Sequence, residues 1–267
     1  MGAMAHELAA EIRAYYDAGG EDTRLRDRPD GRLEFLRTRD ILRRVLPPAP
    51  ATVLDVGGGS GVHAQWLAAD GYGVHLVDPV PRHVHAAAAL PGVTAALGDA
   101  RALSEPDAAY DAVLLLGPLY HLLDRAERVL ALAEARRVCR PGGPVAAATI
   151  SRYAPLYDGL LKDWYGDWPD FAARVLASGV NVGDAPGFTT AYFHHPDEPP
   201  AEFAAAGLPD PRRYAVEGAA WLLGDLGGWL DGGARQDLMI AGLRQVENEP
   251  SLLGASAHLL TVARCAV

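Results

Sequence analysis

The hydrophobic positions of the chain follow a regular alternation from residue 51 onward. Short runs rich in β-branched and other apolar residues alternate with runs in which apolar residues recur at helical spacing. The apolar runs predict strands over residues 52–56, 74–77, 93–97, 112–116 and 145–150, and the other runs predict helices over residues 62–69, 84–90 and 125–140. Because the strands are apolar throughout, they are typical of a parallel sheet covered by helices on both faces.

The segments on either side of this core have weaker patterns. We expect helices over residues 7–16 and 33–46 before it, and a strand over 212–216, a broken helical pair over 219–249 and a last strand over 257–263 after it. Residues 151–200 carry aromatic residues among prolines and glycines, which indicates an insertion that packs over something rather than a part of the sheet; they include Trp164, Tyr165 and Trp168.

These patterns together predict an α/β fold with one doubly wound, mostly parallel, seven-stranded sheet. We divide the chain, as one domain overall, into a helical N-terminal cap (1–50), an α/β core (51–150), a lid insertion (151–200) and a C-terminal part of the sheet with a helical insertion (201–267). Residues 219–249 are, beside the lid insertion, a second segment that could cover a binding site at the edge of the sheet.

Composition limits the class of protein. At 267 residues, with 49% hydrophobic and 22% charged residues, the chain is long enough for a large α/β domain and is not disordered overall. The net charge of −10 disfavours a nucleic-acid partner, because binding to a phosphate backbone depends on cationic groups. With only two cysteines and no apolar run near the about 18 residues of a membrane span, we expect a cytoplasmic protein without disulfides or membrane attachment.

The most informative motif is Asp55-Val56-Gly57-Gly58-Gly59-Ser60-Gly61, which lies between a predicted strand and a predicted helix. Its glycines allow a tight turn that brings the backbone close to a ligand, and the following helix directs free N–H groups there. A nucleotide-type ligand is therefore expected, and a ligand-free turn is the alternative. A dinucleotide is disfavoured, because its motif requires a small residue where this chain has Val62.

The motif resembles that of the class I S-adenosylmethionine-dependent methyltransferases, in which an acidic residue precedes G-x-G-x-G. Asp78, 23 residues after Asp55, resembles the acid that binds the ribose hydroxyls, although a helix cap is its alternative role. The segments 98–100, 110–117 and 137–143 resemble later landmarks of the family. The resemblance implies the Rossmann-like methyltransferase fold, S-adenosylmethionine as cofactor, and cofactor contacts from Asp55, Gly57, Gly58, Gly59, Gly61, Asp78, Pro79, Asp99, Ala100, Leu116 and Gly117.

The N-terminal segment supplies further candidates by rough position. In related small-molecule enzymes an N-terminal helix closes over the cofactor, with a tyrosine or an arginine near its carboxylate. Tyr16 and Arg37 are the main candidates for this contact with the cofactor, and Tyr15 and Arg24 are further ones. A packed aromatic pair and solvated arginines are the alternative interpretation.

The segment Gly117-Pro118-Leu119-Tyr120-His121 follows the fourth strand, where open α/β sheets place their ligands. Tyr120 and His121 are therefore the candidate catalytic residues. His121 either takes a proton from the acceptor or positions it, and we slightly favour positioning; capping of the next helix is the alternative. The adjacent His194 and His195 point to opposite sides of an extended segment, so no metal site is expected.

The sequence thus predicts an enzyme that transfers a methyl group from S-adenosylmethionine to an oxygen or nitrogen atom of a small molecule, with no nucleic-acid partner. One alternative is an enzyme of the same fold that cyclises or cleaves the cofactor. Another is a cofactor-binding protein without turnover. The identity of the acceptor and the oligomeric state remain open, because acceptor contacts come from the variable lid.

Overall fold

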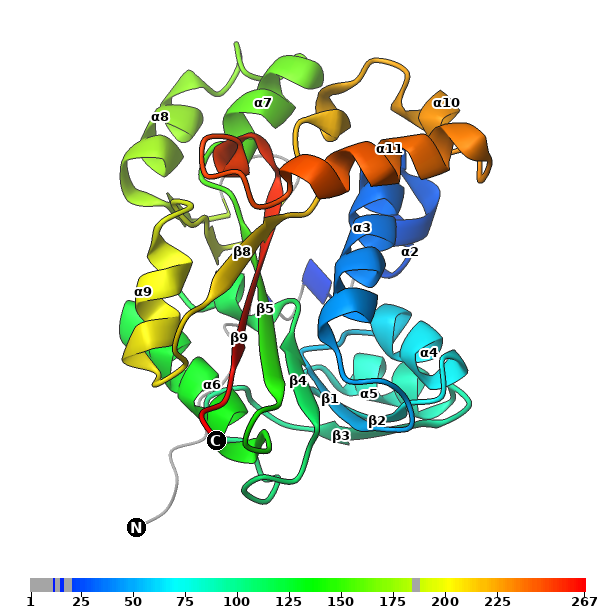
Figure 1. Cartoon of the computed structure of the whole chain (residues 1–267). Coiled ribbons are helices and arrows are strands. Elements are labelled where there is room, and N and C mark those ends of the chain that lie inside the picture. Colours follow the sequence, from blue (N-terminus) through cyan, green and yellow to red (C-terminus); the bar gives the residue numbers. More distant parts are fainter. Residues whose placement is uncertain (1–11, 13–14, 17–20, 184–187) are drawn as a thin grey trace.

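The computed structural model describes residues 12, 15–16, 21–183 and 188–267, and its main feature is one seven-stranded sheet (Figure 1). The strands are β1 (Thr52–Val56), β2 (Gly73–Asp78), β3 (Val93–Leu97), β4 (Ala112–Leu115), β5 (Pro144–Ile150), β8 (Arg212–Ala215) and β9 (His258–Arg264). Their order is β3-β2-β1-β4-β5-β9-β8, and β9 runs antiparallel to both of its neighbours. The predicted doubly wound, mostly parallel, seven-stranded sheet is confirmed.

Strand β1 is the point at which the order of the sheet reverses. Asp55 of β1 pairs with Leu76 of β2 on one side and with Leu114 of β4 on the other. The segments that leave β1 and β4 therefore diverge to opposite faces of the sheet, and a crevice opens between them at the carboxyl ends of the strands.

Helices cover both faces of the sheet (Figure 1). Successive strand residues point to opposite faces, so Leu54 and Val56 pack in a cluster with α6 (Arg125–Val138) and α9 (Glu198–Ala205). Val53 instead packs in the cluster that contains residues of α3 (Pro29–Val45), α4 (Val62–Ala69) and α5 (Pro81–Ala88). The two buried clusters explain why these strands are apolar on both sides.

The helices before the core differ from the prediction. The helix expected over 33–46 begins earlier, at Pro29, and a helix α2 (Glu21–Asp27) that was not expected precedes it. The helix expected over 7–16 lies outside the described residues except for residues 12, 15 and 16. Proline at the first position of α3 explains the early start, because it preorganises the first helical turn.

The segments that follow β5 and β8 lie together beyond the carboxyl ends of the parallel strands (Figure 1). They contain α7 (Ala154–Leu161), α8 (Pro169–Ser178), a small separate sheet of β6 (Val180–Asn181) and β7 (Ala191–Tyr192), and then η2 (Ala220–Leu222), α10 (Leu226–Trp229), α11 (Ala234–Val246) and η3 (Leu253–Ala255). The broken helical pair expected over 219–249 is thus resolved into η2, α10 and α11. These elements cover the end of the sheet at which the crevice opens.

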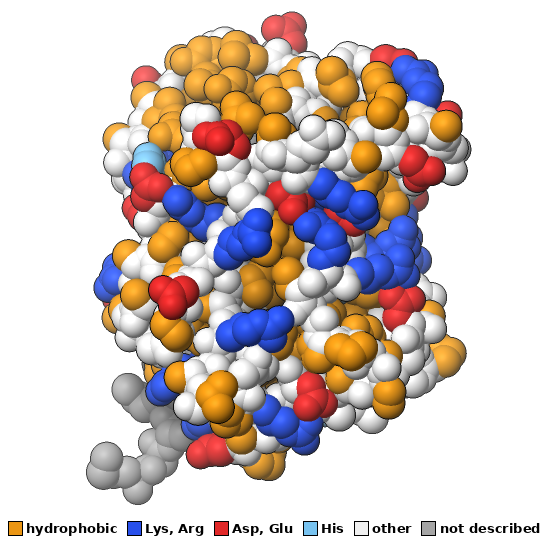
Figure 2. Space-filling view, viewed as in Figure 1, with side chains coloured by type: hydrophobic (Ala, Val, Ile, Leu, Met, Phe, Trp, Pro, Cys, Tyr) orange, Lys and Arg blue, Asp and Glu red, His pale blue; other side chains and the backbone are white. Residues whose placement is uncertain are grey.

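The surface has different characters on its sides and at this covered end. Figure 2 shows basic side chains interspersed with acidic ones around the middle of the face that carries β8 and β9, and apolar side chains gathered over the end near α7 and α8. Leu160 and Leu161 of α7 are 60% and 49% exposed. None of the helices among the described residues combines the length and the apolar character needed to cross a membrane.

A buried ion-pair network holds α3 against the end of α11. The Arg37 side chain is fully buried; its Nε donates to the Val216 carbonyl at 3.0 Å, and its guanidinium pairs with Asp40 and, at 2.6 Å, with Glu247. Arg44 also pairs with Glu247. The network compensates the charge of the Glu247 carboxylate, whose side chain is 4% exposed. The Arg37 guanidinium therefore stabilises the fold.

We therefore expect Arg37→Met to lower the free energy of unfolding by about 3 kcal/mol. This is the low end of the cost of breaking a buried pair, because Arg44 still pairs with Glu247. Urea denaturation measures it. Arg43→Met is the matched control, since the Arg43–Asp70 pair is exposed and contributes about 1 kcal/mol or less. Equal losses in the two variants would contradict a structural role for Arg37.

Candidate functional site

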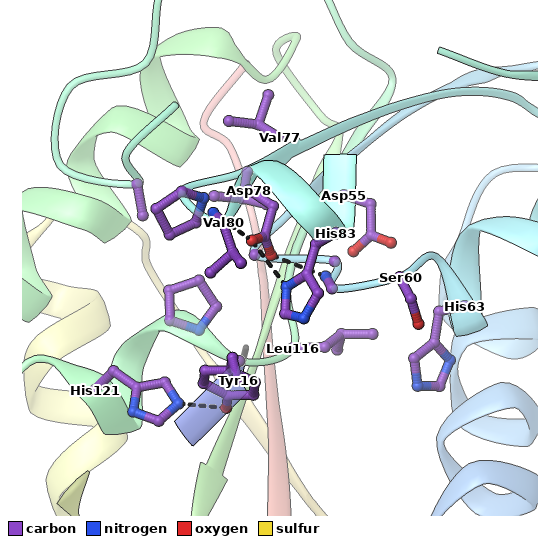
Figure 3. A pocket seen from close by; sticks show the side chains of 18 of the residues that line it. Tyr16, Asp55, Ser60, His63, Val77, Asp78, Val80, His83, Leu116 and His121 are labelled. Atoms are coloured by element: carbon purple, nitrogen blue, oxygen red, sulfur yellow. Dashed lines mark hydrogen bonds and ion pairs between the residues drawn. The ribbon is translucent and has the colours of Figure 1, made fainter. Parts of the chain in front are cut away.

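A cavity of about 190 Å³, here called the first cavity, lies at the carboxyl ends of β1, β2 and β4 (Figure 3). It occupies the crevice created by the reversal of strand order. Most of the residues predicted from the sequence line it, namely Tyr16, Asp55, Gly57, Gly58, Gly59, Asp78, Pro79, Asp99, Ala100, Leu116, Gly117, Tyr120 and His121.

The glycine-rich turn forms one wall of the first cavity. Gly57 has a φ of +67°, and its N–H donates to the Val77 carbonyl at 2.6 Å. A side chain at Gly57 would lie 2.6 Å from Pro118, so the residue must be glycine for conformation and for space. Gly59, also at positive φ, has open space where a side chain would begin. The turn thus leaves room for a ligand against its backbone.

Asp78 connects this turn to the end of β2. Its Oδ2 accepts from the Gly59 N–H at 2.9 Å, and its Oδ1 accepts from the Val80 N–H at 2.9 Å. His83 also contacts Oδ1, at 3.0 Å (Figure 3). Val80 is itself the N-cap residue of α5, so its bond to Asp78 forms a turn just before the helix and is not a helix cap. The Asp78 carboxylate lines the first cavity.

Asp55 has the most unusual environment in the first cavity. It is fully buried, and neither of its carboxylate oxygens has a hydrogen-bond partner among the described residues. Burial, with a smaller contribution from the neighbouring Asp78, raises the pKa of Asp55 to about 7. An orphaned buried carboxylate is costly, so this one fits a ligand that brings a cationic hydrogen-bond donor to it.

His121 joins the N-terminal segment to the wall of the first cavity. Its Nε2 lies 2.6 Å from the Tyr16 hydroxyl, and its Nδ1 lies 3.4 Å from the Thr190 carbonyl (Figure 3). Because the carbonyl only accepts, Nδ1 carries the proton and Nε2 accepts from Tyr16. Burial lowers the pKa of His121 to about 4. Both ring nitrogens of a neutral imidazole are thus engaged by the protein.

A second cavity, of about 210 Å³, adjoins the first. Arg24, Glu34 and Tyr120 line both, so these residues mark the boundary. The rest of its wall is mostly aromatic and apolar, with charged groups added, and includes Ile150, Trp164, Lys162, Phe171, Phe188, Phe193, Glu217, Trp221 and His258. The predicted covering segments, 151–200 and 219–249, both contribute to this wall.

Charged groups meet at the boundary between the cavities. Arg24 binds both carboxylate oxygens of Glu34, at 2.6 and 3.2 Å. Burial opposes ionisation of Glu34, but Arg24 and His258 outweigh it and hold the pKa of Glu34 at about 2. Burial likewise opposes protonation of His258, but Glu34 and Glu217 raise the pKa of His258 to about 9. The cluster is therefore a set of compensated charges.

The same cluster has the residue types of a metal site. Ligand atoms of Glu34, Glu217 and His258 lie within 4.8 Å of one another. The guanidinium of Arg24 already occupies both oxygens of Glu34, however, and a cation placed there would meet its charge. The donor set therefore fits ion pairing better than metal binding. His194 and His195 are apart from it: His194 is buried against Glu202, and His195 is exposed near Asp197.

Three expectations about site residues need correction. Arg37 lines neither cavity, because its guanidinium is buried in the network with Asp40 and Glu247. Gly61 does not line the first cavity; a side chain there would lie 2.5 Å from Leu90, so its small size serves packing at the start of α4. Of the three lid aromatics singled out, only Trp164 lines the second cavity, and Trp168 is 41% exposed.

Sequence reasoning also missed functional candidates. Glu34, Glu217 and His258 were not identified, since each lies in a segment whose pattern indicates only a helix, a loop or a strand. Glu217 and His258 are 41 residues apart, and no local spacing signals their contact. Tyr15, considered with Tyr16, packs its ring against Phe188 with centroids 5.8 Å apart and is not among the lining residues.

Comparison with known proteins gives consistent results. A family model described as a methyltransferase domain matches residues 53–143. An uncharacterized methyltransferase of Mycobacterium tuberculosis is 40% identical over 100 residues, which are 37% of this chain and 40% of that protein, so the match spans less than half of that relative. A ubiquinone biosynthesis O-methyltransferase of Xanthomonas axonopodis is 30% identical over 181 residues, covering 66% of this chain and 70% of that protein.

A solved structure extends the likeness over the whole fold. A putative methyltransferase of Haloferax volcanii, in complex with a methyltransferase activator, has a TM-score of 0.59 at 19% identity, covering 96% of this chain and 98% of that chain. This likeness concerns the fold alone. The sequence match to the family model includes the glycine-rich turn and the residues that follow it. The chain belongs to the class I S-adenosylmethionine-dependent methyltransferases.

Proposed function

We propose that this protein transfers a methyl group from S-adenosylmethionine to an oxygen or nitrogen atom of a small-molecule acceptor. The observation that carries the proposal is the pair of adjoining cavities, which meet at Arg24, Glu34 and Tyr120. One has the family's cofactor motif in its wall, and the other combines aromatic rings with charged side chains. A group passed between two bound molecules needs this arrangement, because holding both in contact supplies much of the rate enhancement.

The residues of the first cavity fit S-adenosylmethionine. The orphaned carboxylate of Asp55 would gain a cationic donor from the ammonium group, and Asp78 would accept hydrogen bonds from the ribose hydroxyls. Asp99 and Ala100 line the cavity at the position implied for the adenine, and Arg101 fixes the Asp99 carboxylate at 2.7 Å. When bound, the cofactor supplies a methyl group on a positively charged sulfur.

The chain's own residues then act by enclosure and orientation. The Tyr16–His121 bond fixes Tyr16 in the wall of the first cavity, and described residues of the segment 151–200 act as a lid on the second. Excluding water strengthens the polar contacts within the site. A small-molecule acceptor is further supported by the relative named for ubiquinone biosynthesis. The acidic chain, with its net charge of −10, supports the absence of a nucleic-acid partner.

The function is tested by incubating the protein with labelled S-adenosylmethionine and a small-molecule extract, followed by mass spectrometry. We expect S-adenosylhomocysteine and a product heavier by one methyl group. Labelled fragments or cyclised cofactor without a methylated product would instead support a cofactor-consuming enzyme. Cofactor binding without any turnover would support a binding protein.

Asp78→Ala should weaken the binding of S-adenosylhomocysteine, because the ribose hydroxyls lose a charged acceptor. The expected loss is about 1.5–3 kcal/mol, measured by calorimetric titration. Asp107→Ala is the control, since the Asp107 side chain is 78% exposed and pairs only with Arg137 among the described residues. Unchanged affinity in a folded Asp78 variant would remove the ribose assignment.

His121→Gln should reduce cofactor affinity about three- to tenfold, as expected for the loss of one hydrogen bond. The turnover number should change little, and Tyr16→Phe should reproduce the effect because it breaks the same bond. Since the pKa of His121 is lowered to about 4, the imidazole stays neutral and its titration should leave no step in the rate between about pH 5 and 8. A fall in turnover of about 10²-fold or more at unchanged affinity would instead place His121 on the acceptor.

A further inference from the structure

The second cavity contains a histidine and a glutamate arranged as an oriented pair. His258 begins β9 opposite Ile150, the last residue of β5, so the antiparallel strand starts at the end of the sheet where the cavities lie. Its Nδ1 lies 2.6 Å from Oε1 of Glu217, which follows β8. Glu217 is 2% exposed, and its Oε2 accepts from the Ser256 hydroxyl at 2.8 Å and from the His258 N–H at 2.9 Å. The carboxylate is thus held rigidly and fixes the imidazole.

The other nitrogen of this imidazole is available to a ligand. Among the described residues the hydrogen bonds and ion pairs of the His258 ring involve Nδ1 and not Nε2, the side chain is 18% exposed, and the residue lines the second cavity. In the neutral imidazole, a carboxylate on Nδ1 places the proton there, so Nε2 carries the lone pair that accepts another proton.

The pair lies at the end of the second cavity that is nearest to the first. Oε2 of Glu34 is 3.7 Å from Nδ1 of His258, and Glu34 lines both cavities. Only the Glu34 side chain therefore separates His258 from the boundary between the cavities. A reactive group bound beside His258 would lie close to the place where the methyl group passes between them.

The remaining wall indicates the kind of molecule that fits. Its lining includes the rings of Tyr120, Trp164, Phe171, Phe188 and Phe193. The indole N–H of Trp164 is already donated to Asp158 at 3.1 Å, and that of Trp221 to the Ala255 carbonyl at 2.9 Å, so these side chains offer apolar ring surface. Rings of this kind pack best against another aromatic ring.

We propose that His258 is the general base of the reaction, positioned by Glu217, and that the acceptor is an aromatic molecule that is methylated on a ring hydroxyl. This inference rests on the proposed methyl transfer and assigns its acceptor class. A hydroxyl is indicated because it must lose a proton to react, whereas a neutral amine needs no base near it.

The methyl transfer conserves atoms and charge. The hydroxyl oxygen forms a bond to the methyl carbon while the bond from that carbon to the sulfonium sulfur breaks. The electron pair of the broken bond stays on sulfur, which leaves S-adenosylhomocysteine. The hydroxyl proton passes to Nε2 of His258, and the imidazolium is stabilised by Glu217 and later returns the proton to water.

Electrostatics supports this role. The charged groups that face His258 are Glu217, Glu34 and Arg24; burial and Arg24 lower the pKa of His258, but the two carboxylates outweigh them and raise it to about 9. A phenol has a pKa of about 10, so transfer of its proton to a base with a pKa near 9 costs less than transfer to an ordinary histidine near 6.5. The rate should therefore rise with pH and level off near pH 9.

The first test compares His258→Gln with the wild-type protein on a series of phenols of decreasing pKa. We expect turnover on ordinary phenols to fall about 10²–10⁴-fold, with unchanged affinity for S-adenosylhomocysteine, and the loss to shrink on nitrophenols, which arrive ionised. His85→Gln, at an exposed site on α5, is the matched control and should be silent. Glu217→Gln should lower turnover and move the pH midpoint down toward about 6.5, because the imidazolium loses a carboxylate.

The second test needs no turnover. A nitrophenol bound to the wild-type protein below its own pKa should show phenolate absorbance, because the positively charged imidazolium of His258 stabilises the phenolate while the phenol proton is released to water, and His258→Gln should abolish the signal. Methylated phenol formed equally well by His258→Gln, or a product methylated only on nitrogen or on an aliphatic hydroxyl, would overturn the inference and leave the proposed methyl transfer intact. Absence of any methylated product from the wild-type protein counts against the proposed function itself.

Discussion

The reversal of strand order at β1 is the constraint on which the rest of the site depends. Strand β1 pairs with β2 on one side and with β4 on the other. The segments that follow β1 and β4 therefore lead to opposite faces of the sheet. The first cavity occupies the crevice between them, with the glycine-rich turn as one wall. The antiparallel β9 adds to this arrangement, since its first residue, His258, pairs with the last residue of β5. Elements of opposite direction thereby bring functional groups to one end of the sheet.

Charge compensation separates the structural carboxylates from those that need a ligand. Glu247 has Arg37 and Arg44, Glu34 has Arg24, and Glu217 has His258 and donors around it. Asp55 is as deeply buried but has no hydrogen-bond partner among the described residues. The contrast between these compensated acids and Asp55 supports the proposal that the partner of Asp55 is the ammonium group of the cofactor.

The cofactor half of the site could be predicted because its residues are close in sequence and obey local rules. Five strands and the turn between Asp55 and Gly61 follow from apolar runs and glycine spacing, and each strand boundary agrees with the structure to within about one residue. Arg37 shows where such reasoning fails. Its position in a helix is right, but a sequence does not show that Glu247, 210 residues away, takes its charge. The role of Arg37 depends on burial against a segment that is distant in the sequence, and not on the local pattern.

The acceptor half could not be predicted for the same physical reason. Its wall is assembled from α2, α3, the turn after β4, the segment 154–193, the segment after β8 and the start of β9. These segments lie far apart in the sequence, so no local pattern shows that they meet in one wall. This construction also separates the two cavities: the carboxylates and glycines of the first belong to β1, β2 and their turns, whereas most of the aromatic rings of the second belong to the segments 151–200 and 219–249. Under the proposed function, substitutions in these segments change the acceptor while the geometry of the first cavity stays fixed by the sheet.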